Sequence, residues 1–130
     1  MFSSPLVNLY TRDIESGIRF YRDLLGFEET FRTPGEGVPT HVEMRLDGFV
    51  LGLGTVEAAR AVHGVEPTPG TASGVVVVWA DDVDRAFADL TAAEAPAVQQ
   101  PHDNGNGNRS AVVRDPDGNL VELVTKVAPS

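Results

Sequence analysis

The same order of strand-like and helix-like segments occurs twice along this chain of 130 residues, and this repeat constrains the fold more than any other feature. An Asp that begins a helical pattern lies at Asp13 and again at Asp82, and an Asp-Gly turn lies at Asp47-Gly48 and again at Asp117-Gly118. The offsets are 69 and 70 residues. A repeat of this size indicates a supersecondary unit that cannot bury its hydrophobic face alone. We therefore expect two similar modules that share a core.

The first half predicts a strand, a helix and three strands. Residues 6–10 have a strand pattern, and Asp13 is a good N-cap for a helix over 14–25, which Gly26 ends. Strands are expected at 27–32, 40–46 and 49–53, the last two joined by the Asp47-Gly48 hairpin. The first module thus spans residues 5–55.

A connecting segment over 56–73, with a short helix near 56–62, precedes the second module at 74–127. This module predicts a strand at 74–80, a helix over 82–93, and strands at 97–100, 110–114 and 120–125. The Asn- and Gly-rich residues 102–108 are expected to form a loop, because both residue types disfavour helix and strand. We expect residues 1–130 to form a single domain.

Composition excludes several classes of function. The net charge of −9 opposes binding to nucleic-acid phosphates and anionic membranes. The absence of cysteine excludes disulfides and thiolate sites. The longest apolar run, residues 74–80, is far shorter than a membrane span, and the N-terminus has no signal-peptide pattern. We expect a cytoplasmic protein that binds neither nucleic acid nor a membrane.

Two motifs resemble those of the vicinal oxygen chelate superfamily, which includes glyoxalase I, bleomycin-resistance proteins, fosfomycin-resistance enzymes and extradiol dioxygenases. Residues 20–27 (FYRDLLGF) resemble its FYxxxLGF helix end, and residues 115–123 (DPDGNLVEL) resemble its DPDGxxxEL hairpin. The resemblance implies an α+β fold in which two βαβββ modules form a curved mixed sheet around a groove, with the helices on the outer face. It also implies a homodimer.

The resemblance further implies four metal-ligand positions, on the first and last strand of each module. Carried over to this chain, they fall on Leu6, Gly52, Val75 and Glu122. Only Glu122 has a side chain that binds metals, and one carboxylate holds a divalent cation weakly. We therefore expect no metal and no cofactor. Without a metal, the Lewis-acid chemistry of the metal-dependent members is not expected either.

Strand alternation predicts which side chains face the groove, because residues of the same parity share a face of the sheet. Tyr10 and Trp79 are approximate repeat equivalents and could sandwich a planar ligand. They could equally close the cavity mouth or pack at a dimer contact. The candidate ligand-binding residues are Asn8, Tyr10, His41, Glu43, Arg45, Gly52, Val75, Val77, Trp79, Arg109 and Glu122.

Glu122 has several interpretations: a residual weak metal ligand, a general base, a carboxylate that binds a ligand group, or an inherited residue paired with Arg45 or Arg109.

The first functional hypothesis is a metal-independent protein that binds an aromatic or cationic small molecule, for drug or metabolite sequestration or antibiotic resistance. Such a protein would resemble the bleomycin-resistance branch of the superfamily, whose members bind a drug or metabolite without transforming it.

The second hypothesis is an enzyme of the same fold, either of glyoxalase or dioxygenase type or one that uses Glu122 as its catalytic base. Tyr10, His41 or Arg45 would assist that base. The third hypothesis is a structural or accessory protein whose groove is filled by its own side chains.

Overall fold

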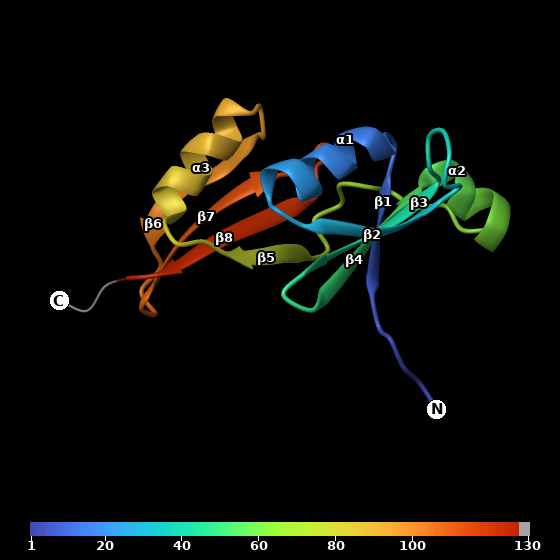
Figure 1. The fold of residues 1–130 in the computed structure, drawn as a ribbon. Coiled ribbons are helices and arrows are strands. Elements are labelled where there is room, and N and C mark those ends of the chain that lie inside the picture. The colour runs from blue at the N-terminus through green and yellow to red at the C-terminus, as the bar shows by residue number, and fades with distance from the viewer. Residues whose placement is uncertain (128–130) are drawn as a thin grey trace. The chain divides into compact units, whose positions relative to one another are not determined.

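A computed structural model describes residues 1–127 (Figure 1). The chain divides into two compact units, Met1–Pro69 and the part that begins at Gly70, and the boundary falls inside the expected connecting segment. Each unit holds one four-stranded mixed sheet with helical segments, which confirms the α+β class. Within residues 1–127, no helix is long and apolar enough to span a bilayer.

Unit 1 has the strand order β1-β4-β3-β2. Strands β1 and β4 pair in parallel, and the other neighbours pair antiparallel. The elements are β1 (Val7–Thr11), α1 (Ile14–Ile18), η1 (Arg19–Leu24), β2 (Glu28–Thr33), β3 (His41–Leu46), β4 (Phe49–Thr55), α2 (Val56–Ala58) and η2 (Ala59–His63).

Unit 2 repeats this arrangement in the order β5-β8-β7-β6. The edge strand β5 again pairs in parallel with its neighbour β8, and the other neighbours pair antiparallel. The βαβββ repeat that the sequence predicts is therefore confirmed in both units. The elements are β5 (Val75–Trp79), α3 (Val83–Ala92), β6 (Ala97–Asp103), β7 (Asn108–Arg114) and β8 (Leu120–Lys126).

The two expected helix caps are present. The Asp13 carboxylate accepts a hydrogen bond from the Ser16 backbone N–H at 3.3 Å, and Asp82 accepts one from the Arg85 N–H at 3.1 Å. Each carboxylate satisfies a backbone donor that has no partner inside its helix. The hydrogen bonds from Ser16 also hold the pKa of Asp13 below its ordinary value.

The first helix differs from the expected regular helix over 14–25, because its second half widens into the π-helical segment η1. The Leu25 N–H bonds to the Phe20 carbonyl at 3.1 Å, one residue further back than in an α-helix. Phe20 and Tyr21 are both buried, and their rings meet edge to face with centroids 5.0 Å apart. Wider turns let two consecutive aromatic side chains reach the same core.

One face of each sheet is covered and apolar. In unit 1, α1 packs against β4, and Val42, Met44, Leu51 and Leu53 are buried. In unit 2, α3 lies along β6, β7 and β8 (Figure 1). Residues of the opposite parity form what we call the open face of each unit. On β3, Val42 and Met44 are buried and Leu46 is half-buried. His41, Glu43 and Arg45 alternate with these apolar residues, as expected.

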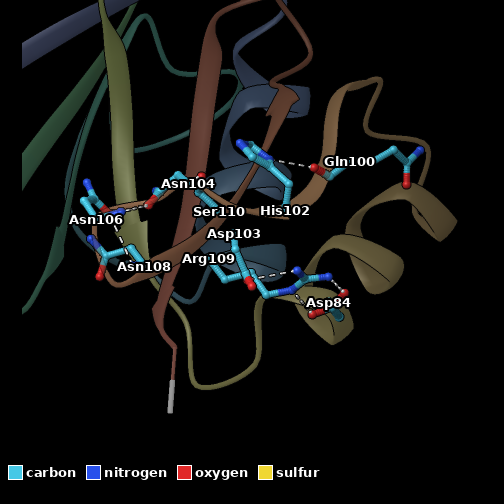
Figure 2. A network of polar contacts seen from close by, with 9 residues as sticks. All are labelled: Asp84, Gln100, His102, Asp103, Asn104, Asn106, Asn108, Arg109 and Ser110. Atoms are coloured by element: carbon cyan, nitrogen blue, oxygen red, sulfur yellow. Dashed lines mark hydrogen bonds and ion pairs between the residues drawn. The ribbon is translucent and has the colours of Figure 1, made fainter. Parts of the chain in front are cut away.

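The expected loop over 102–108 is wrong at both ends. His102 and Asp103 belong to β6 and Asn108 begins β7, so the turn comprises only residues 104–107. Asn104 and Asn106 side-chain oxygens each accept a backbone N–H two residues ahead (Figure 2). These Asx-type hydrogen bonds let the Asn side chains close a tight hairpin that would otherwise be a longer loop.

Candidate functional site

A cavity of about 380 Å³ lies within unit 1. Open-face residues of β1, β3 and β4 form one part of its wall, and the short helical segment α2–η2 after β4 forms another. The lining includes both polar and apolar side chains: Asn8, Tyr10, Thr33, Thr40, His41, Gly54, Thr55, Ala58, Ala59, Val62 and His63.

Two glycines of β4 leave room for the polar side chains above them. Gly52 lies opposite Asn8 on β1 and opposite Glu43 on β3. A Cβ atom at Gly52 would collide with Oδ1 of Asn8 and would lie 3.2 Å from Cε1 of His41. The glycine therefore lets Asn8 and His41 extend over β4 toward each other, which gives a physical reason for Gly52 in a strand interior.

Gly54 is the next residue of β4 on the same face, opposite Tyr10 on β1 and His41 on β3. A Cβ atom there would be 3.9 Å from Cδ1 of Tyr10 and 4.0 Å from Nδ1 of His41, which are ordinary contact distances. Gly54 thus forms an uncovered strip of cavity floor between these two side chains.

His41 and Glu43 form a side-chain pair on the open face. Nε2 of His41 lies 3.1 Å from Oε2 of Glu43, and the His41 ring lies 6.3 Å from the Phe31 ring between centroids. The two side chains are 25% and 30% exposed, so solvent or a ligand can reach both. His41 lines the cavity, and Glu43 fixes the orientation of its ring.

The structure thus brings Asn8, Tyr10 and His41 together around one cavity, with Glu43 and Gly52 beside them. Arg45 lies on the same face but opposite Val50 and Glu28, and it does not line the cavity. Sequence reasoning missed the contribution of α2–η2, including His63. The signal was the short helix expected near residues 56–62, whose position against the sheet could not be read from periodicity.

The candidates of unit 2 lie on its own open face. Val75, Val77 and Trp79 point from the outer strand β5, and Trp79 is 61% exposed. Glu122 lies on β8 between Val77 of β5 and Val112 of β7. Among residues 1–127, no hydrogen bond or ion pair holds its half-buried carboxylate.

Arg109 is not the partner of Glu122, which corrects that interpretation. Its guanidinium bonds to both Asp84 oxygens at 2.8 and 2.9 Å and to Asp103 at 3.1 Å (Figure 2). Asp84 belongs to α3, so Arg109 lies on the helix side of the sheet with Ala111. These hydrogen bonds raise the pKa of Arg109 and hold that of Asp84 below its ordinary value.

The four family metal-ligand positions do not supply a metal site. Leu6 and Val75 have hydrocarbon side chains, and the space beside Gly52 is taken by Asn8. Within each sheet, Gly52 pairs with Asn8 and Glu122 pairs with Val77, so neither has a donor of the family type opposite it. Over the described chain, no three His, Asp or Glu side chains converge on one point. The residues present therefore do not fit the metal arrangement of the family.

The sequence matches the Glyoxalase/Bleomycin resistance protein/Dioxygenase superfamily over residues 4–123. TioX from Micromonospora sp. ML1 is 27% identical, with a TM-score of 0.72 over 96% of this chain and 100% of TioX. Lactoylglutathione lyase from Agrobacterium tumefaciens is 29% identical, with a TM-score of 0.68 over 94% of this chain and 92% of the lyase.

The hypothetical protein SA1046 from S. aureus shares the fold at 21% identity, with a TM-score of 0.80 over 96% of this chain and 94% of its own. No curated protein has a significant match to this sequence. The repeat, the strand order in both sheets and the family match over most of the chain agree. The chain belongs to the glyoxalase/bleomycin resistance protein/dioxygenase superfamily and has the vicinal oxygen chelate fold.

Proposed function

We propose that this protein binds a small organic molecule in the unit 1 cavity and that no metal ion takes part. The main support is the glycine-floored cavity itself. At Gly52, a family metal-ligand position, the chain has no side chain, and Asn8 and His41 occupy the space instead. A position that holds a metal in other members thus serves here to place two hydrogen-bonding groups beside a cavity.

The size and lining of the cavity suit an organic ligand. Pockets for small molecules measure roughly 300–1,000 Å³ and combine apolar walls with a few polar groups. Here Ala58 and Val62 supply apolar surface, while Asn8, Tyr10 and His41 supply hydrogen-bonding groups. An aromatic ligand would stack on the rings, and the net charge of −9 favours a cationic one. We propose sequestration of a drug or metabolite as the biological role.

A ligand screen with a matched pair of variants tests this proposal. Backbone amide shifts of the ¹⁵N-labelled protein would be followed against a library of aromatic and cationic compounds in the presence of EDTA. We expect hits that shift amides of β1, β3 and η2. Tyr10→Ala should weaken these hits, whereas Trp79→Ala, at the equivalent place in unit 2, should not. Ligands that bind only in the presence of a divalent metal, or that bind Tyr10→Ala as tightly as the unmodified protein, would contradict the proposal.

A second candidate function is an enzyme that uses Glu122 as a general base. The supporting observation is a half-buried carboxylate, between Val77 and Val112, that no described residue neutralises. Such a carboxylate can accept a proton from a bound substrate. Once an activity is detected, Glu122→Gln should abolish it while leaving the melting temperature near that of the unmodified protein. Unchanged turnover in this variant would exclude the mechanism.

We also propose a homodimer, as the family resemblance implies. The outer strand β5 exposes Val75, Val77 and Trp79, a short apolar row that a second copy could cover. Light scattering after gel filtration at micromolar concentration should give twice the mass of one chain. A monomer mass at that concentration would refute this part of the proposal.

A further inference from the structure

The pairing of His41 with Glu43 determines which nitrogen of the imidazole can accept a hydrogen bond. An ionised carboxylate has no proton to donate, so the 3.1 Å contact requires that Nε2 of His41 carries the hydrogen. In the neutral ring the other nitrogen, Nδ1, then holds a free lone pair.

Nδ1 is the nitrogen nearest Gly54. It lies 4.0 Å from the place of a Cβ atom at Gly54, and both residues line the cavity. Gly54 has no side chain that could cover this nitrogen. The cavity therefore receives a hydrogen-bond acceptor at a defined place, whereas Glu43, which orients it, is not part of the cavity lining.

We propose that the His41–Glu43 pair makes the unit 1 cavity selective for ligands that carry a weakly acidic hydroxyl group, a phenol or an enol, which donates to Nδ1 of His41. This inference rests on the proposed function and adds the chemical class of the ligand. A proton that moves from the hydroxyl to Nδ1 leaves an oxyanion on the ligand and a cationic imidazole. The Glu43 carboxylate then stabilises that cation at short range.

Other groups that face His41 fit the same ligand. Tyr10 and Asn8 border the glycine floor beside the ring, and a side-chain amide or phenol can donate a hydrogen bond to the ligand oxygen. His63 lines the cavity from η2 and is the other titratable imidazole there. It has no carboxylate partner among the described residues, so its tautomer is not fixed in the same way.

The selectivity can be measured with two probes that differ at one oxygen: 4-nitrophenol has an acidic hydroxyl group, and 4-nitroanisole has a methyl ether in its place. We expect 4-nitrophenol to bind about tenfold more tightly, the size of effect that one added hydrogen bond produces. His41→Phe keeps a ring against Phe31 but removes the lone pair, and it should make the two affinities equal. His63→Phe should preserve the preference. Equal binding of both probes by the unmodified protein, or no binding of either, would overturn the inference.

The tautomer gives a readout that needs no ligand. The chain has three His residues, so long-range ¹H–¹⁵N spectra of the side chains can be assigned with the His102→Gln and His63→Phe variants. We expect His41 to carry its proton on Nε2 in the neutral ring, and Glu43→Gln to reduce both this tautomer population and the preference for 4-nitrophenol. A neutral His41 protonated on Nδ1 would overturn the inference even if other small molecules bind the cavity.

The proposed function is judged separately, by the library screen and the Tyr10→Ala variant. If the screen yields ligands without acidic hydroxyl groups, the cavity binds small molecules but the His41–Glu43 pair does not select them. Urea midpoints of all variants establish that they are folded.

Discussion

At the scale of single residues, hydrogen bonds explain why the turn between β7 and β8 contains Asp115 and Asn119. Asp115 is buried, and its Oδ1 accepts the backbone N–H groups of Asp117 and Asn119, each at 2.9 Å. Its Oδ2 accepts the side-chain amide of Asn119 at 3.0 Å, and that amide oxygen accepts the Gly70 N–H at 3.2 Å. The hairpin motif, one of the two that carry the family resemblance, therefore connects the start of unit 2 to its last hairpin by a hydrogen bond.

Gly70 is the residue in this contact that tolerates substitution least. It has a φ of +87°, and a Cβ atom there would lie 2.5 Å from the Asp117 carbonyl oxygen. Gly105 has nearly the same φ, +86°, with nothing within 4 Å of its Cβ position. We expect Gly105→Ala to cost about 1–2 kcal/mol from backbone strain alone, and Gly70→Ala to cost roughly 1–3 kcal/mol more from overpacking. Urea unfolding of both variants checks this, and equal losses would contradict it.

Gly52 and Gly54 of β4 allow a second matched comparison. Gly52→Ala would displace the flexible Asn8 side chain, whereas Gly54→Ala would make only ordinary contacts with Tyr10 and His41. We expect Gly52→Ala to change unfolding free energy by less than about 1 kcal/mol, because the exposed Asn8 can rotate away, yet to shift the Asn8 side-chain amide signals. Gly54→Ala should leave those signals in place. Unshifted Asn8 signals in Gly52→Ala would show that the side chain does not lie over β4.

At the scale of elements, Arg109 joins three parts of unit 2. It lies on β7 and bonds to Asp84 in the first turn of α3 and to Asp103 at the end of β6 (Figure 2). The pKa of Asp84 lies below its ordinary value because of the hydrogen bond from Arg109. The folded state therefore holds this carboxylate ionised at pH values where the unfolded chain binds a proton, and the stabilising effect is lost as pH falls through the folded pKa.

We predict that Arg109→Met flattens the dependence of stability on pH in the acid range. Above about pH 5 both states are ionised at Asp84, and the contribution of the pair is fully present. Below about pH 4 the unmodified protein should lose stability more steeply than Arg109→Met. Urea midpoints between pH 3 and pH 7 measure the difference. The effect should be small, because the Asp84 side chain is 56% exposed and that of Arg109 is 33% exposed. Parallel curves for the two proteins would contradict this explanation and would mean that other carboxylates dominate the pH dependence.

Much of the order of helices and strands could be predicted from the sequence, because it depends on interactions between residues that are close along the chain. Asp13 and Asp82 cap helices through their own side chains, and the Asp-Gly turns fix the hairpins within a few residues. The π-helical widening after Ile18 could not be read, because it depends on where Phe20 and Tyr21 find space in the core. Likewise the partners of Arg109 depend on tertiary position, because Asp84 lies 25 residues away in the sequence and on a different element.

At the scale of the whole molecule, the two units share one fold but have different side chains at equivalent positions. Tyr10 and Trp79 hold equivalent places on β1 and β5, yet Tyr10 lines a cavity with His41 and Asn8 while Trp79 is largely exposed among valines. The candidate site was partly predictable, since strand parity identified Asn8, Tyr10 and His41. The α2–η2 contribution was not, because a short helix in a connecting segment carries no signal of the sheet face it meets.

The metal content of the purified protein tests the central claim most directly. It should be measured by mass spectrometry, together with melting curves in EDTA and after addition of Ni²⁺, Zn²⁺, Mn²⁺ or Fe²⁺. A native metal site raises the melting temperature when the ion is added. We predict less than stoichiometric metal and no shift, with Glu122→Gln behaving like the unmodified protein. Stoichiometric metal and a clear rise in melting temperature that Glu122→Gln removes would contradict metal-independent binding.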